Sequence, residues 1–412
     1  MFINKFVYSL VGSMYVGKPS PPEEIVDRQK EVEQVVDRCS NRKINYAIAL
    51  LGYRRIGKTT ILLKVKEELE SRGALVVYFD VKKNLSDPAS FLNRLQKTVF
   101  SEYLRHTGLR KRSVGALKNA AEQAFHVVSN AIKGVKGVSV QLTLKPNGEV
   151  ELEPKLEFGR SPDYGEMFDA TFESINRISK SVDNKVVIIL DEFQDLIKLH
   201  RYRGLGNILE RFRDVIQNRA KNMSYVISGS QVHLTREFIE KGRGTAFLHF
   251  IEIDIEELEE PFATELFGKY CSARGIDSNQ VRRGAREAYQ LVGGHPFYLM
   301  SLAEAWDGRM PLGDTYRNIL TSPRKPLSIY AEYVLAADLA GARRGEPALR
   351  TILGSLAEGP KSVGELAKSI NATQAGLPSY LTELIKYDLI TFHEGKYAIR
   401  DKIIRDYLYF TK

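Results

Sequence analysis

The stretch "LLGYRRIGKTTILLKV" restricts the fold of this chain more than any other segment. It matches the pattern G-x-x-x-x-G-K-[ST], with Gly52 and Gly57 as its glycines, followed by Lys58 and Thr59. Glycines let backbone N–H groups turn toward phosphate oxygens, and a helix that follows adds the positive end of its dipole. An apolar run precedes the loop and a helical pattern follows it. The spacing predicts a phosphate-binding loop in which the lysine reaches the β- and γ-phosphates and the threonine hydroxyl ligates Mg²⁺.

Five short apolar runs recur along the first 260 residues and alternate with helical patterns. This alternation is typical of a parallel sheet covered by helices, that is, of a layered α/β domain. A hairpin inserted at about 133–159 is also predicted, because alternating apolar and polar residues flank Asn147-Gly148. The predicted strands are residues 45–52, 74–81, 185–192, 223–230 and 248–255, and the helices between them include 91–103, 164–181 and 206–219.

The third apolar run, "VVIILDEFQD", ends in two acids. A parallel strand that ends at Asp191 would place its carboxylate beside Thr59, where it can hold Mg²⁺. Glu192 follows directly, and a glutamate at that position can orient and deprotonate an attacking water. The pair therefore favours hydrolysis over phosphoryl transfer to a small molecule. The next strand ends in "ISGSQ", so Ser228 or Ser230 is either a γ-phosphate sensor or part of an ordinary strand-to-loop turn.

After residue 260 the pattern becomes helical. Three short helices fit residues 347–357, 362–370 and 373–387, and "DLITFHEGKYAIRD" then predicts a hairpin with Gly395 at its turn. Three helices and a two-stranded hairpin describe a winged helix. The expected organisation is an N-terminal segment with the first helix at 1–44, a core at 45–260, a helical lid at 261–329 and a winged-helix domain at 330–412.

Four motifs, "GYRRIGKTT", "LDEFQD", "SGSQ" and "GGHPFYL", resemble the archaeal-type ATPase family. That family belongs with the signal-transduction ATPases (STAND), which are relatives of AAA+ proteins. "EEIVDRQKEVEQV" resembles the first helix of the family, and "YAIRDKIIRDYLYF" resembles the end of its winged helix. The resemblance thus covers nearly the whole chain. It implies a P-loop core of the ASCE/AAA+ type with a helical lid and a C-terminal winged-helix domain.

The resemblance also implies ATP or ADP with Mg²⁺, and hydrolysis that is slow or stimulated by a partner. Adenine would lie between residues 25–28 and the lid, and His295-Pro296 would contact the base or ribose, although a histidine before proline is more often a packed, hydrogen-bonded side chain. Arg243 departs from the family pattern and is expected as a surface arginine rather than an arginine finger. Lys58, Glu192 and Ser230 are the expected catalytic residues, and Thr59 and Asp191 the metal ligands. The implied nucleotide contacts are Ile25, Val26, Arg28, Gly52, Arg54, Arg55, Ile56, Gly57, Lys58, Thr59, Thr60, His295 and Pro296.

The formal net charge is +9, and the basic residues are unevenly placed. Residues 101–150 carry eight Lys and Arg against three Asp and Glu, whereas the last 83 residues carry eleven against ten. Phosphate neutralisation supplies most non-specific DNA affinity, so the terminal domain is a poor duplex binder. Residues 105–136, with Arg110, Lys111 and Arg112, and residues 201–221 are the better DNA-contact candidates, and a solvated surface is the alternative for both.

The cysteine content and the lengths of the apolar segments exclude other classes of protein, namely disulfide-stabilised, zinc-binding and membrane-spanning ones. The two cysteines, Cys39 and Cys271, lie far apart and form no C-x-x-C motif, so neither a disulfide framework nor a zinc site is expected. No segment approaches the roughly 18–20 uninterrupted apolar residues of a membrane span. Both observations fit a cytoplasmic protein without a membrane partner.

Three interpretations remain open. The first is an ATP-driven STAND-type switch whose output is a protein partner. The second is an AAA+-like DNA factor of the origin-recognition or loader type, favoured by the net charge and by the predicted winged helix. The third is a nucleotide-binding scaffold that hydrolyses little ATP. Glu192 argues against the third and the near-neutral terminal domain against the second. The sequence does not address the pathway or the oligomeric state.

Overall fold

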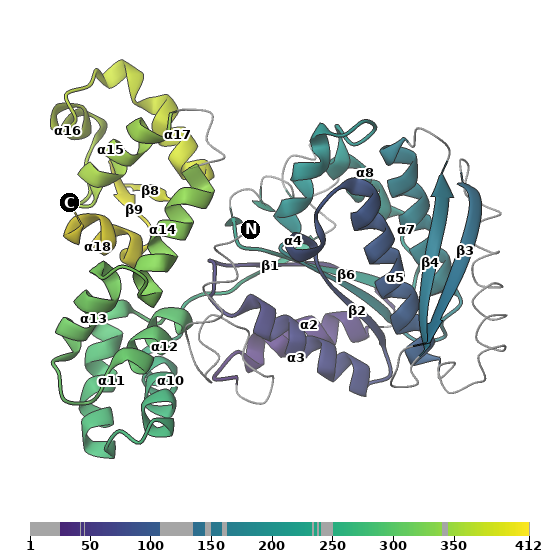
Figure 1. Ribbon diagram of the computed structural model, residues 1–412, viewed down its shortest axis with the longest axis horizontal. Coiled ribbons are helices and arrows are strands. Elements are labelled where there is room, and N and C mark those ends of the chain that lie inside the picture. Colours follow the sequence, from purple (N-terminus) through teal and green to yellow (C-terminus); the bar gives the residue numbers. More distant parts are fainter. Residues whose placement is uncertain are drawn as a thin grey trace.

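The computed structural model describes residues 25–41, 43–44, 46–107, 135–144, 150–158, 163–232, 235–236, 239, 250–339 and 345–411. These residues form an α/β lobe and a helical lobe (Figure 1). No helix in the described ranges is long and apolar enough to cross a membrane. Several predictions lie outside these ranges: the segment 1–24, the turn at Asn147-Gly148, most of the basic segment 105–136 with Arg110, Lys111 and Arg112, and Arg243.

A five-stranded parallel sheet forms the centre of the α/β lobe, which confirms the predicted fold class of the core. Each strand lies within one of the five apolar runs. Because all strands run in the same direction, their carboxyl ends meet at one edge of the sheet. The order across the sheet is β2 (Leu75–Asp80), β5 (Val186–Asp191), β6 (Met223–Gly229), β1 (Ala47–Leu51) and β7 (Phe250–Asp254).

Helices cover both faces of the sheet (Figure 1). Alternate residues of β1 enter different cores: Ala47, Ala49 and Leu51 pack on one face, and Ile48 and Leu50 on the other. This alternation follows from the period of two along a strand. The first face is covered by α5 (Pro88–His106), α7 (Tyr164–Lys180) and α8 (Ile208–Gln217), and the second by α2 (Gln29–Ser40) and α3 (Lys58–Ser71).

The segment predicted as an inserted hairpin contains two antiparallel strands, β3 (Val135–Leu144) and β4 (Val150–Phe158). They pair from Leu144 and Val150 outward and form a separate two-stranded sheet. β4 lies beside α5, on the outer side of the α/β lobe (Figure 1). The hairpin is therefore remote from the edge at which β1 and β5 end.

The helical lobe shares one hydrophobic core, which runs from Leu258 to Ile404. Its middle helix, α14, packs against both α13 and α18, so the predicted division near residue 330 stays a prediction. The elements are α10 (Glu260–Ala273), α11 (Ser278–Val292), α12 (Pro296–Ala305), α13 (Leu312–Thr321), α14 (Pro326–Leu339), α15 (Glu346–Leu356), α16 (Val363–Ser369), η5 (Gln374–Gly376), α17 (Pro378–Lys386), β8 (Ile390–His393), β9 (Lys396–Ile399) and α18 (Lys402–Phe410).

The helix predicted at 373–387 is divided in the structure. Residues Gln374–Gly376 form a 3₁₀ turn, and α17 begins at Pro378. Proline has no backbone N–H and cannot continue an i→i−4 ladder, but it fits the first position of a new helix. The other two predicted helices and the hairpin occur in the expected order. The assignment of this segment as a winged helix stays a prediction.

Gly294, between α11 and α12, packs closely against the segment that follows β7. Its carbonyl oxygen accepts a hydrogen bond of 2.9 Å from the Leu258 backbone N–H. A Cβ atom at this glycine would lie 1.8 Å from the Leu258 carbonyl oxygen. No side chain fits this contact, so the position requires glycine.

We expect Gly294→Ala to lower the free energy of unfolding by about 1–3 kcal/mol, the usual cost of overpacking. Gly313→Ala is the matched control: Gly313 lies in α13 with nothing within 4 Å of its added Cβ. Alanine in that helix should stabilise by about 0.5–1 kcal/mol. Thermal unfolding followed by circular dichroism would measure both. Equal melting temperatures for the two variants would contradict the close approach.

Candidate functional site

The loop between β1 and α3 has the conformation of an anion cradle. Gly57 has φ 109°, in the left-handed region, and α3 begins at the next residue. The N-cap residue Gly57 has no side chain to cap the first turn of α3, and that turn contains no acid. Gly52 is also required, because a Cβ there would lie 2.8 Å from the Ile255 carbonyl oxygen. The N–H groups at this helix end are therefore available to an anion.

Lys58 is buried at the centre of this loop, with 4% of its surface exposed. Its Nζ donates hydrogen bonds to the carbonyl oxygens of Gly52 (2.6 Å) and Tyr53 (2.7 Å). An ammonium has three donors, so these two bonds leave capacity for one more acceptor. Burial lowers the pKa of Lys58 to about 8, and the carboxylates of Glu192 and Asp191 oppose that shift. A phosphate oxygen would supply both the missing acceptor and negative charge.

Asp191 connects this loop to the neighbouring strands. The Thr59 hydroxyl and the Tyr78 hydroxyl both donate to its Oδ2, each at 2.7 Å. Its Oδ1 accepts from the Ser228 hydroxyl and from the Glu192 backbone N–H, the latter at 3.0 Å. Asp191 thus lies beside Thr59, as the sequence predicted, whereas no sequence motif indicated that Tyr78 would contact Asp191.

This donor set fits a divalent cation only in part. A hydroxyl and one carboxylate are adjacent, and the described ranges contain no group of three or more His, Cys, Asp or Glu side chains that could hold a metal. Mg²⁺ prefers six oxygen ligands and is usually held by one or two carboxylates together with phosphates and water. The residues present therefore fit Mg²⁺ that arrives with a phosphate compound.

Glu192 has a strained backbone and a well-defined side chain. Its φ of 54° lies in the left-handed region. The Ser230 hydroxyl donates to Oε2 at 2.7 Å, and Gln194 Nε2 donates to the same oxygen. Burial raises the pKa of Glu192, but the Lys58 ammonium and these two hydrogen bonds outweigh it and leave the pKa below its usual value. The carboxylate is thus ionised at neutral pH, as a general base requires.

The two candidate serines have different partners. Ser228 bonds the predicted metal ligand, Asp191, and Ser230 bonds the predicted base, Glu192. Ser230 is also within 3.2 Å of Gln194 Nε2. Ser228 also accepts a hydrogen bond of 3.1 Å from the Glu192 backbone N–H, whereas Ser230 bonds the Glu192 carboxylate. A sensor role for Ser230 stays a prediction.

The paired arginines of the loop point toward the helical lobe. Arg54 Nη2 forms an ion pair of 2.6 Å with Asp338 of α14, and the Arg55 guanidinium lies 4.1 Å from the Phe297 ring centroid. Ile56 is fully buried in the core behind the loop, and Thr60 is buried in the first turn of α3. The predicted nucleotide contacts of these four residues stay predictions, and for the arginines the structure shows side-chain partners in the other lobe.

The segment at residues 25–28 lies between the two lobes, where adenine was expected. Ile25 packs against the α2–α3 face of the core, and Val26 packs against the core of the helical lobe. Arg28 is buried, and its Nη2 donates to the Glu256 carbonyl oxygen at 2.6 Å. The position agrees with the implied role, and direct contact with a base stays a prediction.

His295 is packed against both lobes. Its Nε2 donates to the Arg54 carbonyl oxygen at 3.0 Å, and its ring stacks on Tyr298 with centroids 3.8 Å apart. Nδ1 is buried and has no hydrogen-bond partner among the described residues. The neighbouring Pro296 begins α12. His295 thus has the packed, hydrogen-bonded role, and a contact of His295-Pro296 with the nucleotide stays a prediction.

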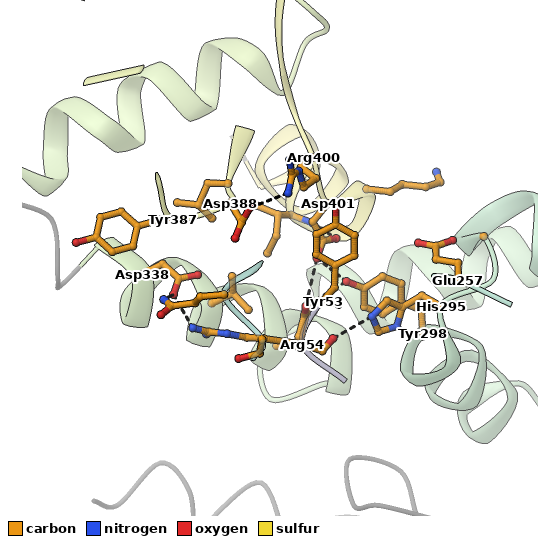
Figure 2. Close-up of a pocket in the computed structure, with 18 of the residues that line it drawn as sticks. Tyr53, Arg54, Glu257, His295, Tyr298, Asp338, Tyr387, Asp388, Arg400 and Asp401 are labelled. Atoms are coloured by element: carbon orange, nitrogen blue, oxygen red, sulfur yellow. Dashed lines mark hydrogen bonds and ion pairs between the residues drawn. The ribbon is translucent and has the colours of Figure 1, made fainter. Parts of the chain in front are cut away.

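A cavity of about 170 Å³ lies where the loop, the end of β6 and the helical lobe meet (Figure 2). Figure 2 shows Arg54 reaching toward Asp338, and Arg400 toward Asp388 with Tyr53 beside it. Within the part of the chain that the structure describes, three polar atoms of its lining residues are buried without a hydrogen-bond partner: Arg54 Nη1, His295 Nδ1 and Arg400 Nε. Sequence motifs gave no indication of this cavity, because its walls come from segments far apart in the chain.

The basic segment 201–221 is partly occupied by internal contacts. Arg211 forms an ion pair with Asp169, and Arg219 bonds the Ile216 carbonyl oxygen. Arg201 and Arg203 are exposed. One positive charge of this segment is therefore already paired, and a second arginine is bonded to the backbone.

Burial of His295 predicts a specific dependence of stability on pH. Burial lowers the pKa of His295 to about 3, from 6.5 in an unfolded chain; the Arg54 hydrogen bond opposes the shift, and Lys58 and the nearby arginines add to it. Below pH 6.5 the unfolded state binds a proton that the folded state does not, so stability falls as the pH falls. Between pH 7 and pH 5 this group should reduce the free energy of unfolding by about 2 kcal/mol.

Urea unfolding of the wild type and His295→Gln at pH 7, 6 and 5 would measure this effect. The advantage of the wild type over the variant should shrink by that amount as the pH falls. His393→Gln, at a side chain that is 85% exposed, is the matched control. A constant difference between the wild type and His295→Gln would contradict the prediction.

Comparison with known proteins agrees with this geometry. The model of a family described as an ATPase domain predominantly from Archaea matches residues 25–302. No curated protein matches the chain. A Walker-type ATPase of Pyrococcus abyssi is 17% identical, with 98% of this chain and 99% of that chain covered and a TM-score of 0.62. The ORC2 protein of Aeropyrum pernix, solved as ADPNP–ADP complexes, is 12% identical, with 96% and 98% covered and a TM-score of 0.51. The phosphate loop between β1 and α3 and the strand β5, which ends in Asp191, lie within the matched residues. The chain belongs to this archaeal ATPase family.

Proposed function

We propose that this protein binds and hydrolyses ATP with Mg²⁺ and acts as a STAND/AAA+-like switch that couples nucleotide state to its C-terminal lobe. One observation carries the proposal: Lys58, Thr59, Asp191 and Glu192 converge at one sheet edge. The similar Aeropyrum pernix protein was solved with ADPNP and ADP, which supports a nucleotide at the corresponding fold position.

The residues of the edge have separate roles in binding. The backbone of residues 52–57 and the Lys58 ammonium would hold the phosphates, and Thr59 and Asp191 would hold the metal. Bound Mg²⁺ would neutralise charge on the phosphate oxygens. The segment 25–28 and the start of α12 would border the base, because the first packs on both lobes and His295, at the start of the second, bonds the phosphate loop.

Glu192 would act as general base toward water. Its carboxylate is ionised and held by Ser230 and Gln194, so its orientation is fixed before substrate arrives. An orienting shell of this kind supports hydrolysis, because a base must point at the proton that it accepts. A scaffold that hydrolyses little ATP, the third interpretation, would not need an oriented general base.

Coupling to the C-terminal lobe would run through α14. Asp338 accepts hydrogen bonds from Arg54 in the phosphate loop and, at 3.2 Å, from Gln231, the residue after Ser230. At the other end of the same helix, Tyr330 donates to Asp401 at 3.2 Å, and Asp401 caps α18. Both the phosphate loop and the segment after β6 therefore contact one helix of the C-terminal lobe. That lobe contains the proposed winged helix, which would be the output for a protein partner.

The alternative is an AAA+-like DNA factor. The net charge of +9 and the exposed Arg201 and Arg203 favour it. The near-neutral last 83 residues disfavour it, since duplex affinity depends on phosphate neutralisation. Steady-state hydrolysis at low salt, with and without duplex DNA, separates the two. A strong DNA-dependent rise that Arg110, Lys111 and Arg112 charge reversal removes would favour the DNA factor.

The proposed function predicts opposite defects for two substitutions. Lys58→Ala should abolish nucleotide binding, because it removes the buried cation of the loop. Glu192→Gln should keep binding and lower the hydrolysis rate by at least about 100-fold, the lower end of the usual range for loss of a general base. Equilibrium binding of fluorescent ATP and phosphate release would be measured for both. Glu192→Gln hydrolysis at the wild-type rate would show that Glu192 is not the base.

A further inference from the structure

Lys82 lies at the same sheet edge as the phosphate site, but on the other side of β5. β2 pairs with β5 in parallel, so that Asp80 lies beside Asp191. Lys82 follows two residues later in the short helix α4 (Val81–Asn84), which Asp80 caps by accepting a hydrogen bond from the Lys83 N–H. The backbone therefore places Lys82 beyond Asp191, on the side opposite the phosphate loop.

The helical lobe holds the Lys82 ammonium. Lys82 Nζ donates to the Tyr333 hydroxyl of α14 at 3.0 Å and lies 5.6 Å from the centroid of its ring. The same ring faces the Arg54 guanidinium at 5.9 Å. Tyr333 thus contacts two cationic side chains, one from the loop after β1 and one from the segment after β2.

Tyr333 is a weak partner for an ammonium in this position. A neutral phenol accepts one hydrogen bond, whereas bonds to an ionised acceptor such as phosphate are roughly twice as strong. Partial desolvation lowers the pKa of Lys82, but contact with Tyr333 and attraction to Glu192 outweigh it, so the ammonium stays charged. The Lys82 ammonium in turn helps to lower the pKa of Glu192.

We propose that Lys82 is a second phosphate-contacting lysine, which exchanges the Tyr333 hydroxyl for the terminal phosphate of a bound nucleoside triphosphate. The inference rests on the proposed function. Lys58 would contact the phosphates from the side of β1, and Lys82 from the side of β2, whose Asp80 lies beside Asp191. A diphosphate has no group at this place, so Lys82 then remains on Tyr333 and α14 remains attached to α4.

The test compares binding of a non-hydrolysable ATP analogue and of ADP, each with Mg²⁺, by fluorescence titration. Lys82→Met should weaken the triphosphate analogue roughly tenfold, the effect of losing one hydrogen bond between charged groups, and leave ADP within about twofold. Lys83→Met is the matched control, since it removes the same charge one residue away, where Lys83 pairs with Asp80 at 2.7 Å. The control should leave the ratio of the two affinities unchanged.

Tyr333→Phe tests the positioning role, because it removes the hydroxyl and keeps the ring. Freed from that hydroxyl, Lys82 should bind the triphosphate analogue about two- to fivefold more tightly. In the Lys82→Met background the tyrosine substitution should change nothing. An equal effect of Tyr333→Phe in both backgrounds would overturn the positioning role.

The possible failures are distinguishable. If the wild type binds neither nucleotide, both the proposed function and the inference are wrong. If the wild type binds both and Lys82→Met leaves the affinity ratio unchanged, the function stands and Lys82 is not a phosphate ligand. If Lys82→Met and Lys83→Met lower the ratio equally, the effect is general electrostatics and the inference is again overturned.

Discussion

The whole site depends on one buried carboxylate at the edge of the parallel sheet. Asp191 ends β5 and accepts hydrogen bonds from Thr59 after β1, Tyr78 in β2 and Ser228 in β6. Side chains of three other sheet segments thus meet at one group, which is feasible because parallel strands all end at the same edge. These bonds fix Asp191, and its contact with the backbone N–H of the next residue helps to set the unusual conformation of Glu192.

A second constraint acts between the lobes. The Arg54–Asp338 pair has side chains that are only 18% and 5% exposed. Removing one member of a buried pair leaves an uncompensated charge, at a cost of about 3–5 kcal/mol. The phosphate loop therefore cannot change the position of Arg54 without a new partner for Asp338. Lys82 and Tyr333 form a second contact between α14 and this sheet edge, an exposed hydrogen bond rather than a buried ion pair.

The sequence was most informative where structure is local. Buried parallel strands are continuous apolar runs, which is why all five strands were predicted within a few residues. The spacing of Gly52, Gly57 and Lys58 predicted the loop, because this motif is also local in the sequence. The partners Tyr78–Asp191 and Arg54–Asp338 are separated by 113 and 284 residues, and no pattern in one sequence connects them. The side-chain directions of Arg54 and Arg55 likewise depend on tertiary packing. The break before Pro378 has a different cause, because proline has no backbone N–H with which to continue a helix.

The central claim is that nucleotide at the loop changes the contacts of α14 and, through Asp401, of α18. Amide hydrogen exchange of the full chain with ADP and with a non-hydrolysable ATP analogue tests it most directly. The account predicts that the exchange rates of Pro326–Leu339 and Lys402–Phe410 differ between the two nucleotides, together with those of the phosphate loop. Differences confined to the loop and the segments after β5 and β6 would contradict the claim, because the helical lobe would then be indifferent to the terminal phosphate.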